Sequence, residues 1–226
     1  MSFAVLFIVM LFSCGEKKIA SQNETLAADG ASQEMTNKTL PSILFFGNSI
    51  TAGYQLDMEE AFPHLIQLRL DSMGYSYQVI NAGLSGETTA AGKERIDWVL
   101  RSVPDIFCLE LGANDGLRGL PLDETEKNLQ IIIDKVKQAN PQVKVILAGM
   151  QVPPNMGAEY TDTFKQIFPR LAQQNQAELI PFILDGVAGN PELNLSDGIH
   201  PTAAGHQILA ETVWKHLLPL LEKQES

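Results

Sequence analysis

The chain has 226 residues, of which 45% are hydrophobic and 19% are charged. This length and composition suit one globular domain with a sizeable core and some additional segments. The formal net charge of -11 argues against a uniformly basic nucleic-acid-binding surface, because contacts with phosphates need clustered Lys and Arg. The same acidity gives the protein no electrostatic attraction to anionic membranes. We therefore expect no nucleic-acid partner.

The N-terminus begins with an apolar run at residues 4–12, AVLFIVMLF. The run is too short to span a bilayer, but it matches the hydrophobic region of a signal peptide. The stretch Leu11-Phe12-Ser13-Cys14 resembles a bacterial lipobox, whose cysteine is lipidated and becomes the first mature residue. A buried first strand is the alternative, although a long polar tract follows where a turn would be expected.

These features predict three parts of the chain. Residues 1–14 are expected to form a lipoprotein signal peptide that ends at Cys14. Residues 15–40 are rich in polar side chains and are expected to form a flexible tether. Residues 41–226 then form the folded domain. Such a protein is exported and anchored by its lipid in the bacterial cell envelope, facing the periplasm or the cell surface.

Strand-like and helix-like segments alternate from residue 41 onward. Short apolar runs predict strands at residues 42–46, 77–80, 105–111, 143–147 and 178–182. Helices are predicted at residues 59–73, 88–100, 164–174 and 203–221, with another that begins with a capping-box-like sequence near Asp123. Strands separated by helices require right-handed crossovers and a parallel sheet covered on both faces. The predicted fold is a single three-layer α/β/α sandwich with a mostly five-stranded parallel sheet.

Small polar turns follow three of these strands. They are Gly47-Asn48-Ser49, Gly83-Leu84-Ser85-Gly86 and Gly112-Ala113-Asn114-Asp115. Taken alone, Ser49 is better explained as a turn or helix-capping residue. In parallel sheets, however, ligands bind outside the carboxyl ends of the strands. Three polar turns that converge on this edge therefore predict a functional site.

A serine nucleophile needs a base, usually a histidine that a carboxylate orients. His64 and His216 lie within predicted helices, and His206 begins the last helix, where a capping or solvent-facing role is expected. His200 differs because it lies in the loop Asp197-Gly198-Ile199-His200-Pro201. A spacing of three residues allows the Asp197 carboxylate to reach the imidazole nitrogen that faces away from the serine.

Acyl transfer also needs hydrogen-bond donors for the oxyanion that develops on the carbonyl oxygen. Gly86 can offer a backbone N–H at close range because it has no Cβ. Asn114 offers a side-chain amide, and the backbone N–H of Ser49 is a third donor. The sequence contains no P-loop, no HExxH motif and no cysteine pair, so nothing in it predicts a metal site or a cofactor.

The four blocks GNSITAGY, NAGLSGETT, LGANDGLRG and DGIHP, in this order, resemble the SGNH (GDSL) hydrolases. They are most similar to the bacterial branch of multifunctional thioesterases, arylesterases and lysophospholipases. The resemblance runs from about residue 43 to the C-terminus. It implies a flavodoxin-like fold, a triad of Ser49, His200 and Asp197, and no metal. It also implies an oxyanion hole formed by the N–H groups of Ser49 and Gly86 and the amide of Asn114.

One position departs from the family pattern. The first block of the family usually reads Gly-Asp-Ser, and this chain has Asn48 in place of the Asp. Since that Asp is outside the triad, we expect the reaction to survive. Asn keeps the hydrogen-bonding shape but removes a charge beside the nucleophile, so a shift in rate or pH optimum is expected.

The sequence thus predicts a serine esterase or thioesterase that hydrolyses small-molecule or lipid esters. It leaves the oligomeric state open, with a monomer favoured. Tyr54 and the loop residues Val152 and Pro153 are expected to face the substrate. One alternative is an acetyl esterase that acts on polysaccharide or cell-wall O-acetyl groups. The other is a surface lipoprotein that binds a small ligand and does no chemistry.

Overall fold

The computed structural model describes residues 40–223, so the predicted signal peptide, Cys14 and most of the predicted tether lie outside the described residues. Five parallel strands form one sheet with the order β2-β1-β3-β4-β5. The strands are β1 (Ser42–Gly47), β2 (Gln78–Gly83), β3 (Ile106–Glu110), β4 (Lys144–Ala148) and β5 (Glu178–Ile180). The predicted five-stranded parallel sheet is therefore confirmed.

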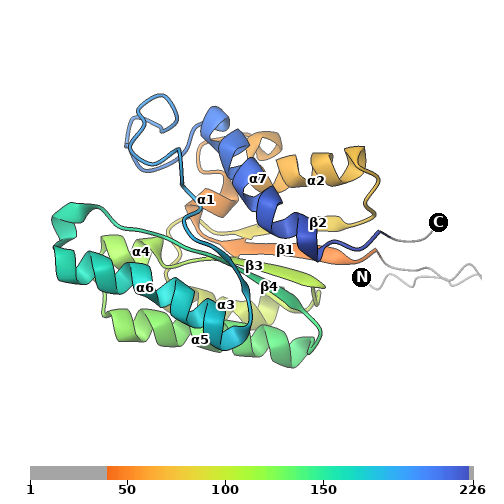
Figure 1. Ribbon diagram of the computed structural model, residues 1–226, viewed down its shortest axis with the longest axis horizontal. Coiled ribbons are helices and arrows are strands. Elements are labelled where there is room, and N and C mark those ends of the chain that lie inside the picture. Colours follow the sequence, from red (N-terminus) through yellow and green to blue (C-terminus); the bar gives the residue numbers. More distant parts are fainter. Residues whose placement is uncertain (1–39, 224–226) are drawn as a thin grey trace, which may run out of the picture. The chain divides into compact units, whose positions relative to one another are not determined.

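Helices cover both faces of the sheet, which confirms the three-layer arrangement (Figure 1). One face carries α2 (Phe62–Ser72) and α7 (Ala203–Leu217). The opposite face carries α3 (Thr89–Val99), α5 (Leu122–Ala139) and α6 (Ala158–Asn175). Two short helices, α1 (Ser49–Ala52) and α4 (Ala113–Leu117), follow strand ends directly. Within residues 40–223, no helix has the length and apolarity needed to cross a membrane.

The core is built around β1, which lies between β2 and β3 and whose residues are all buried. Side chains alternate between the two faces of a strand, so consecutive aromatic residues point in opposite directions. Phe45 packs edge-to-face against Phe62 of α2, with the ring centroids 5.3 Å apart. Phe46 packs against Phe107 and lies under the guanidinium group of Arg95 from α3. Burial of each such side chain stabilises the fold by roughly 1.5–3 kcal/mol.

Prolines and a missing cap explain where several elements differ from their predicted bounds. β5 ends at Ile180 because Pro181 follows, and proline has no N–H to continue the ladder. The last helix ends at Leu217 and continues only as a 3-10 turn, η3 (Leu218–Leu220), which contains a proline. The predicted capping box near Asp123 is wrong, since α5 begins at Leu122 after Pro121 and has no side-chain cap.

His206 was expected to cap the last helix or to face solvent, and this expectation is wrong. Its side chain is buried, and its Nδ1 accepts a hydrogen bond from the Phe62 N–H at 3.0 Å. The bond provides an acceptor for an N–H in the first turn of α2, which has no partner within the helix. Burial lowers the pKa of His206 to about 4, so the ring is neutral at physiological pH and can accept this bond.

Candidate active site

The first polar turn places Ser49 at the start of a helix. Asn48 is the N-cap of α1, and its side-chain Oδ1 accepts the Ile50 N–H at 3.0 Å. Ser49 is the first residue of α1 and is 8% exposed. The N–H of a first helical residue has no acceptor within the helix. The backbone of Ser49 is therefore available to donate to a ligand at the carboxyl edge of the sheet.

Ser49, His200 and Asp197 lie in a continuous chain of contacts. His200 Nε2 is 2.9 Å from Ser49 Oγ, and His200 Nδ1 is 2.7 Å from Asp197 Oδ2. Asp197 Oδ1 also accepts the backbone N–H groups of His200 and Ile199. The hydrogen bonds from the His200 N–H, the His200 ring and the Ile199 N–H lower the pKa of Asp197 to about 2. This carboxylate is therefore ionised at neutral pH and can only accept hydrogen bonds.

The charge on Asp197 determines the tautomer of the neutral imidazole. Because a carboxylate has no proton to donate, His200 Nδ1 carries the hydrogen and donates it. Nε2 is then left as an acceptor, and the Ser49 hydroxyl donates to it. This is the arrangement in which an imidazole can remove a proton from a serine.

The loop that carries His200 is closed by a backbone hydrogen bond between its ends, and a side chain at its base binds the preceding segment. The Leu195 N–H donates to the His200 carbonyl oxygen at 2.7 Å. Asn194 Nδ2 donates to the carbonyl oxygens of Val187 and Asn190, at 2.7 and 2.8 Å. These bonds fix the imidazole from its own backbone, so its position does not depend on the contact with Ser49 alone.

The two other predicted oxyanion donors also lie on the turns at the strand ends. Asn114 lies in the first turn of α4, and its Nδ2 donates one hydrogen to the Glu87 carbonyl oxygen at 3.0 Å. The second amide hydrogen remains available for a ligand. Gly86 has φ +81°, and an added Cβ would meet nothing within 4 Å. Glycine is thus favoured here by its left-handed backbone conformation, and no atom of the described residues crowds the position.

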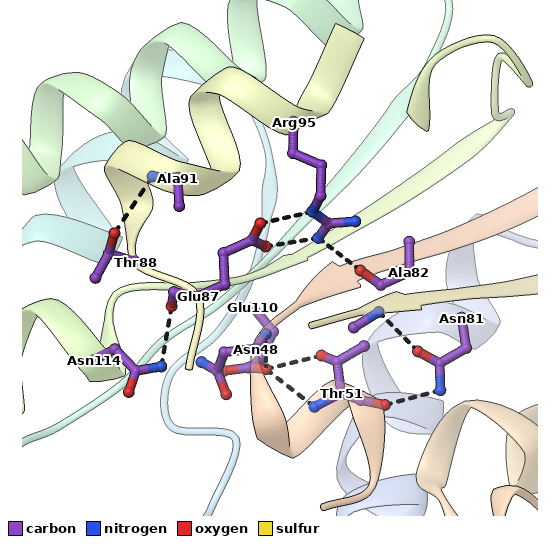
Figure 2. A network of polar contacts seen from close by, with 11 residues as sticks. Asn48, Thr51, Asn81, Ala82, Glu87, Thr88, Ala91, Arg95, Glu110 and Asn114 are labelled. Atoms are coloured by element: carbon purple, nitrogen blue, oxygen red, sulfur yellow. Dashed lines mark hydrogen bonds and ion pairs between the residues drawn. The ribbon is translucent and has the colours of Figure 1, made fainter. Parts of the chain in front are cut away.

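A buried ion pair holds the turn that contains Gly86, and sequence analysis missed it. Glu87 is 4% exposed, and both of its carboxylate oxygens accept from the Arg95 guanidinium at 2.6 Å. Arg95 Nη2 also donates to the Ala82 carbonyl oxygen at the end of β2 (Figure 2). The same Glu87 binds the Asn114 amide through its backbone. Glu87 therefore connects two of the three polar turns through its backbone carbonyl oxygen, while its carboxylate is held by Arg95.

An apolar cavity of about 410 Å³ adjoins the site, since it is lined by Ile50 and Ile199, the residues next to Ser49 and His200 in the sequence. Its lining includes Ile50, Leu117, Val152, Pro153, Leu184 and Ile199. Val152 and Pro153 thus lie where a substrate could reach them. Tyr54 lies elsewhere, with its ring centroid 4.4 Å from that of His200. Among residues 40–223, no group of three His, Cys, Asp or Glu side chains is placed to hold a metal ion.

Comparisons with known proteins point to one family. Residues 45–208 match the GDSL-like Lipase/Acylhydrolase family. The chain is 39% identical over 181 residues to esterase TesA of Pseudomonas aeruginosa, covering 80% of this chain and 89% of that protein. It is 38% identical to an arylesterase of Vibrio mimicus over 78% of this chain and 88% of that one. It is 34% identical to thioesterase 1/protease 1/lysophospholipase L1 of Escherichia coli K12, over 80% and 85%.

Solved structures give the same result. The crystal structure of TesA superimposes with a TM-score of 0.76, covering 80% of this chain and 99% of that chain at 39% identity. A psychrotrophic esterase, EstA from Pseudoalteromonas sp., superimposes with a TM-score of 0.75 and 30% identity, covering 79% and 97%. The structure of EstA is described as inhibited by monoethylphosphonate.

Removing Arg95 tests whether the buried pair stabilises the site. We expect Arg95→Ala to lower the free energy of unfolding by about 3 kcal/mol, because Glu87 is left as a buried charge without a partner. The matched control is Arg170→Ala, which removes an equally bidentate pair with Glu126 at the surface. There a loss below about 1 kcal/mol is expected. Urea unfolding of both variants measures the difference, and equal losses would contradict the role of burial.

Proposed function

The chain belongs to the GDSL-like lipase/acylhydrolase family and is a carboxylic ester hydrolase, and we propose that it cleaves acyl and aryl esters and thioesters through an acyl-enzyme on Ser49. The observation that carries the proposal is the chain of contacts from Ser49 through His200 to Asp197. The proposed roles are nucleophile for Ser49, base and acid for His200, and orienting carboxylate for Asp197.

In the proposed reaction, Ser49 Oγ attacks the carbonyl carbon while His200 Nε2 takes the hydroxyl proton. Asp197 stabilises the imidazolium that forms. The negative charge on the carbonyl oxygen is stabilised by the N–H groups of Ser49 and Gly86 and by the free amide hydrogen of Asn114. When the intermediate collapses, His200 gives its proton to the departing alcohol or thiol. Water then attacks the acyl-enzyme with His200 as base, which releases the acid and restores Ser49.

The cavity beside Ser49 supports an acyl chain as the group that is bound. Its volume of about 410 Å³ and its apolar lining suit a hydrocarbon chain or an aryl ring, which gains by leaving water. An acetyl group on a sugar would leave most of this apolar surface without contact. We therefore prefer acyl or aryl esters to the alternative of carbohydrate O-acetyl groups. As the chain is an ester hydrolase, the alternative of a lipoprotein without chemistry is not retained.

Replacing the nucleophile tests the proposed mechanism. We expect Ser49→Ala to lower kcat for p-nitrophenyl esters by roughly 10⁴-fold or more, because the acyl-enzyme can no longer form. Labelling by a fluorophosphonate probe should be lost together with activity. Ser85→Ala is the control, since Ser85 is an exposed serine on a neighbouring turn. Full ester hydrolysis by Ser49→Ala would show that the proposed mechanism is wrong.

Narrowing the cavity tests the proposed substrate class. Ala188 lines the cavity, and we expect Ala188→Phe to reduce kcat/KM for a p-nitrophenyl decanoate substrate by roughly tenfold or more. Hydrolysis of p-nitrophenyl acetate should change little, because an acetyl group does not reach into the cavity. The control is Ala139→Phe, at the far end of α5. Turnover of acetylated xylan above that of long-chain esters, or an equal effect of Ala188→Phe on both chain lengths, would contradict the proposal.

We propose further that Cys14 is lipidated and anchors the enzyme in the cell envelope. The support is the apolar run followed by Leu11-Phe12-Ser13-Cys14 in the sequence. We expect the full chain, expressed in a bacterium, to fractionate with membranes, and Cys14→Ser to move into the soluble fraction because it lacks the acceptor thiol. Ser21→Ala is the control in the polar tract. Membrane association of Cys14→Ser through a modified terminus would exclude the lipobox.

A further inference from the structure

Glu110 is a buried carboxylate beside the proposed nucleophile that the mechanism above does not use. It ends β3, whose other residues are apolar, and it is 1% exposed. Figure 2 shows its side chain directed at the start of α1, where it lies against Asn48 and Thr51. Gly47 of β1 leaves the space that it occupies, since a Cβ there would overlap Thr51 Oγ1 and Glu110 Oε2.

The two carboxylate oxygens of Glu110 have different partners. Oε2 accepts three hydrogen bonds, from the Asn48 N–H at 3.3 Å, the Thr51 N–H at 3.2 Å and Thr51 Oγ1 at 2.8 Å. Oε1 accepts one, from Asn48 Nδ2 at 2.7 Å. All of these donors belong to the residues that flank Ser49 on either side. The backbone of the nucleophile is thus held from both directions by one side chain.

Asn48 is constrained at both ends of its amide. While Nδ2 donates to Glu110, Oδ1 accepts the Ile50 N–H at 3.0 Å and lies 3.3 Å from Ser49 Oγ. Rotating the amide by half a turn would direct a donor at the Ile50 N–H and an acceptor at the carboxylate. One orientation therefore satisfies every partner, and that orientation depends on an acceptor at position 110.

We propose that Asn48 and Glu110 form a positioning pair that holds the Ser49 hydroxyl in line with His200, an inference that rests on Ser49 being the nucleophile. Glu110 does not touch the reacting atoms. It acts through Asn48 and Thr51 on the first turn of α1. The pair contributes to catalysis by keeping Ser49 Oγ in line with His200 Nε2.

The ionisation of Glu110 depends on these donors, because no cationic side chain of the described residues balances its charge. No Lys, Arg or His of residues 40–223 forms an ion pair with it. Burial raises the pKa of Glu110 to about 7, although the hydrogen bonds from Thr51 and Asn48 act to lower it. The neighbouring elements β1 and α1 carry no ionisable side chain, and the ionisable neighbour on its own strand is the buried Cys108.

Exchanging the amide and the carboxylate between positions 48 and 110 distinguishes a positioning role from a purely structural one. In Glu110→Gln, the new carbonyl oxygen can take the three donors of Oε2, so the new NH₂ must face Asn48 Nδ2. Two donors then oppose each other, and α1 shifts. Asn48→Asp combined with Glu110→Gln restores the contact in the opposite sense, because the amide at position 110 donates to the carboxylate at position 48. The total charge is unchanged in the double variant.

We expect Glu110→Gln to lower kcat for p-nitrophenyl butyrate by about 10- to 100-fold with KM within about twofold, because small displacements of a nucleophile cost rate more than binding. The double variant should recover to within a few-fold of the native kcat. Glu178→Gln is the control, a carboxylate on β5 that pairs with His216 far from Ser49 in the sequence. Additive losses of kcat in the double variant, or an effect on KM alone, would overturn the proposal that Asn48 and Glu110 act as a pair.

The single variant Asn48→Asp gives an independent readout that does not require Glu110→Gln to fold. It places two carboxyl groups about 2.7 Å apart, at the distance of the native contact, so they must share one proton. Loss of that proton at alkaline pH should separate them. We expect kcat of Asn48→Asp to fall between about pH 8 and 10, whereas the native enzyme and the double variant keep theirs. A flat alkaline profile for Asn48→Asp would overturn the proposal.

The same measurements separate this inference from the proposed function. If Ser49→Ala keeps esterase activity in the native background, the assigned nucleophile is wrong. If Ser49→Ala is inactive but the cycle between positions 48 and 110 is additive, the nucleophile stands and the positioning pair fails. The rate of fluorophosphonate labelling at Ser49 reports the reactivity of the hydroxyl directly, and it should follow kcat across the four members of the cycle.

Discussion

The hydrogen bonds that Glu110 accepts from Asn48 and Thr51 are the contacts on which the geometry of the site depends. A helix that begins directly after a buried strand brings into the interior backbone N–H groups that have no acceptor within the helix. The Glu110 carboxylate, at the matching end of the adjacent strand, accepts the Thr51 N–H and shares the Asn48 N–H with its own backbone carbonyl oxygen. Asn48 Oδ1 accepts the Ile50 N–H. The cost of burying a carboxylate is offset by satisfying groups that would otherwise prevent α1 from starting where it does.

The other two polar turns are joined through Glu87. Its carboxylate accepts hydrogen bonds from the Arg95 guanidinium, and its backbone carbonyl oxygen accepts one from the Asn114 amide. The Arg95 guanidinium in turn lies over the Phe46 ring, 4.2 Å from its centroid, so the ion pair rests on the apolar core around β1. A site assembled from three loops thereby gains the rigidity of the sheet, which is needed if its donors are to stay fixed as charge develops on a substrate.

The three layers and the alternation of strands and helices along the chain could be predicted from the sequence, because apolar runs and turns repeat over many residues. The sequence also predicted which turns meet because parallel strands end on one edge. It did not predict α1 or α4, since helices of four and five residues show no periodicity. Glu110 and Arg95 were also missed, although a lone carboxylate at the end of an apolar strand was a visible signal. Their partners lie 59 to 62 and 8 to 13 residues away, and only the fold shows such pairs.

The replacement of the usual Asp by Asn48 can now be understood from its neighbour. An Asp at this position would face Glu110 at hydrogen-bond distance, and the two carboxyl groups would have to hold a proton between them. Asn48 donates a hydrogen of its own, so the contact survives at any pH at which Glu110 is ionised. Alkaline solution then leaves the position of Ser49 unchanged. The substitution therefore removes one protonation requirement from the site without removing a hydrogen bond.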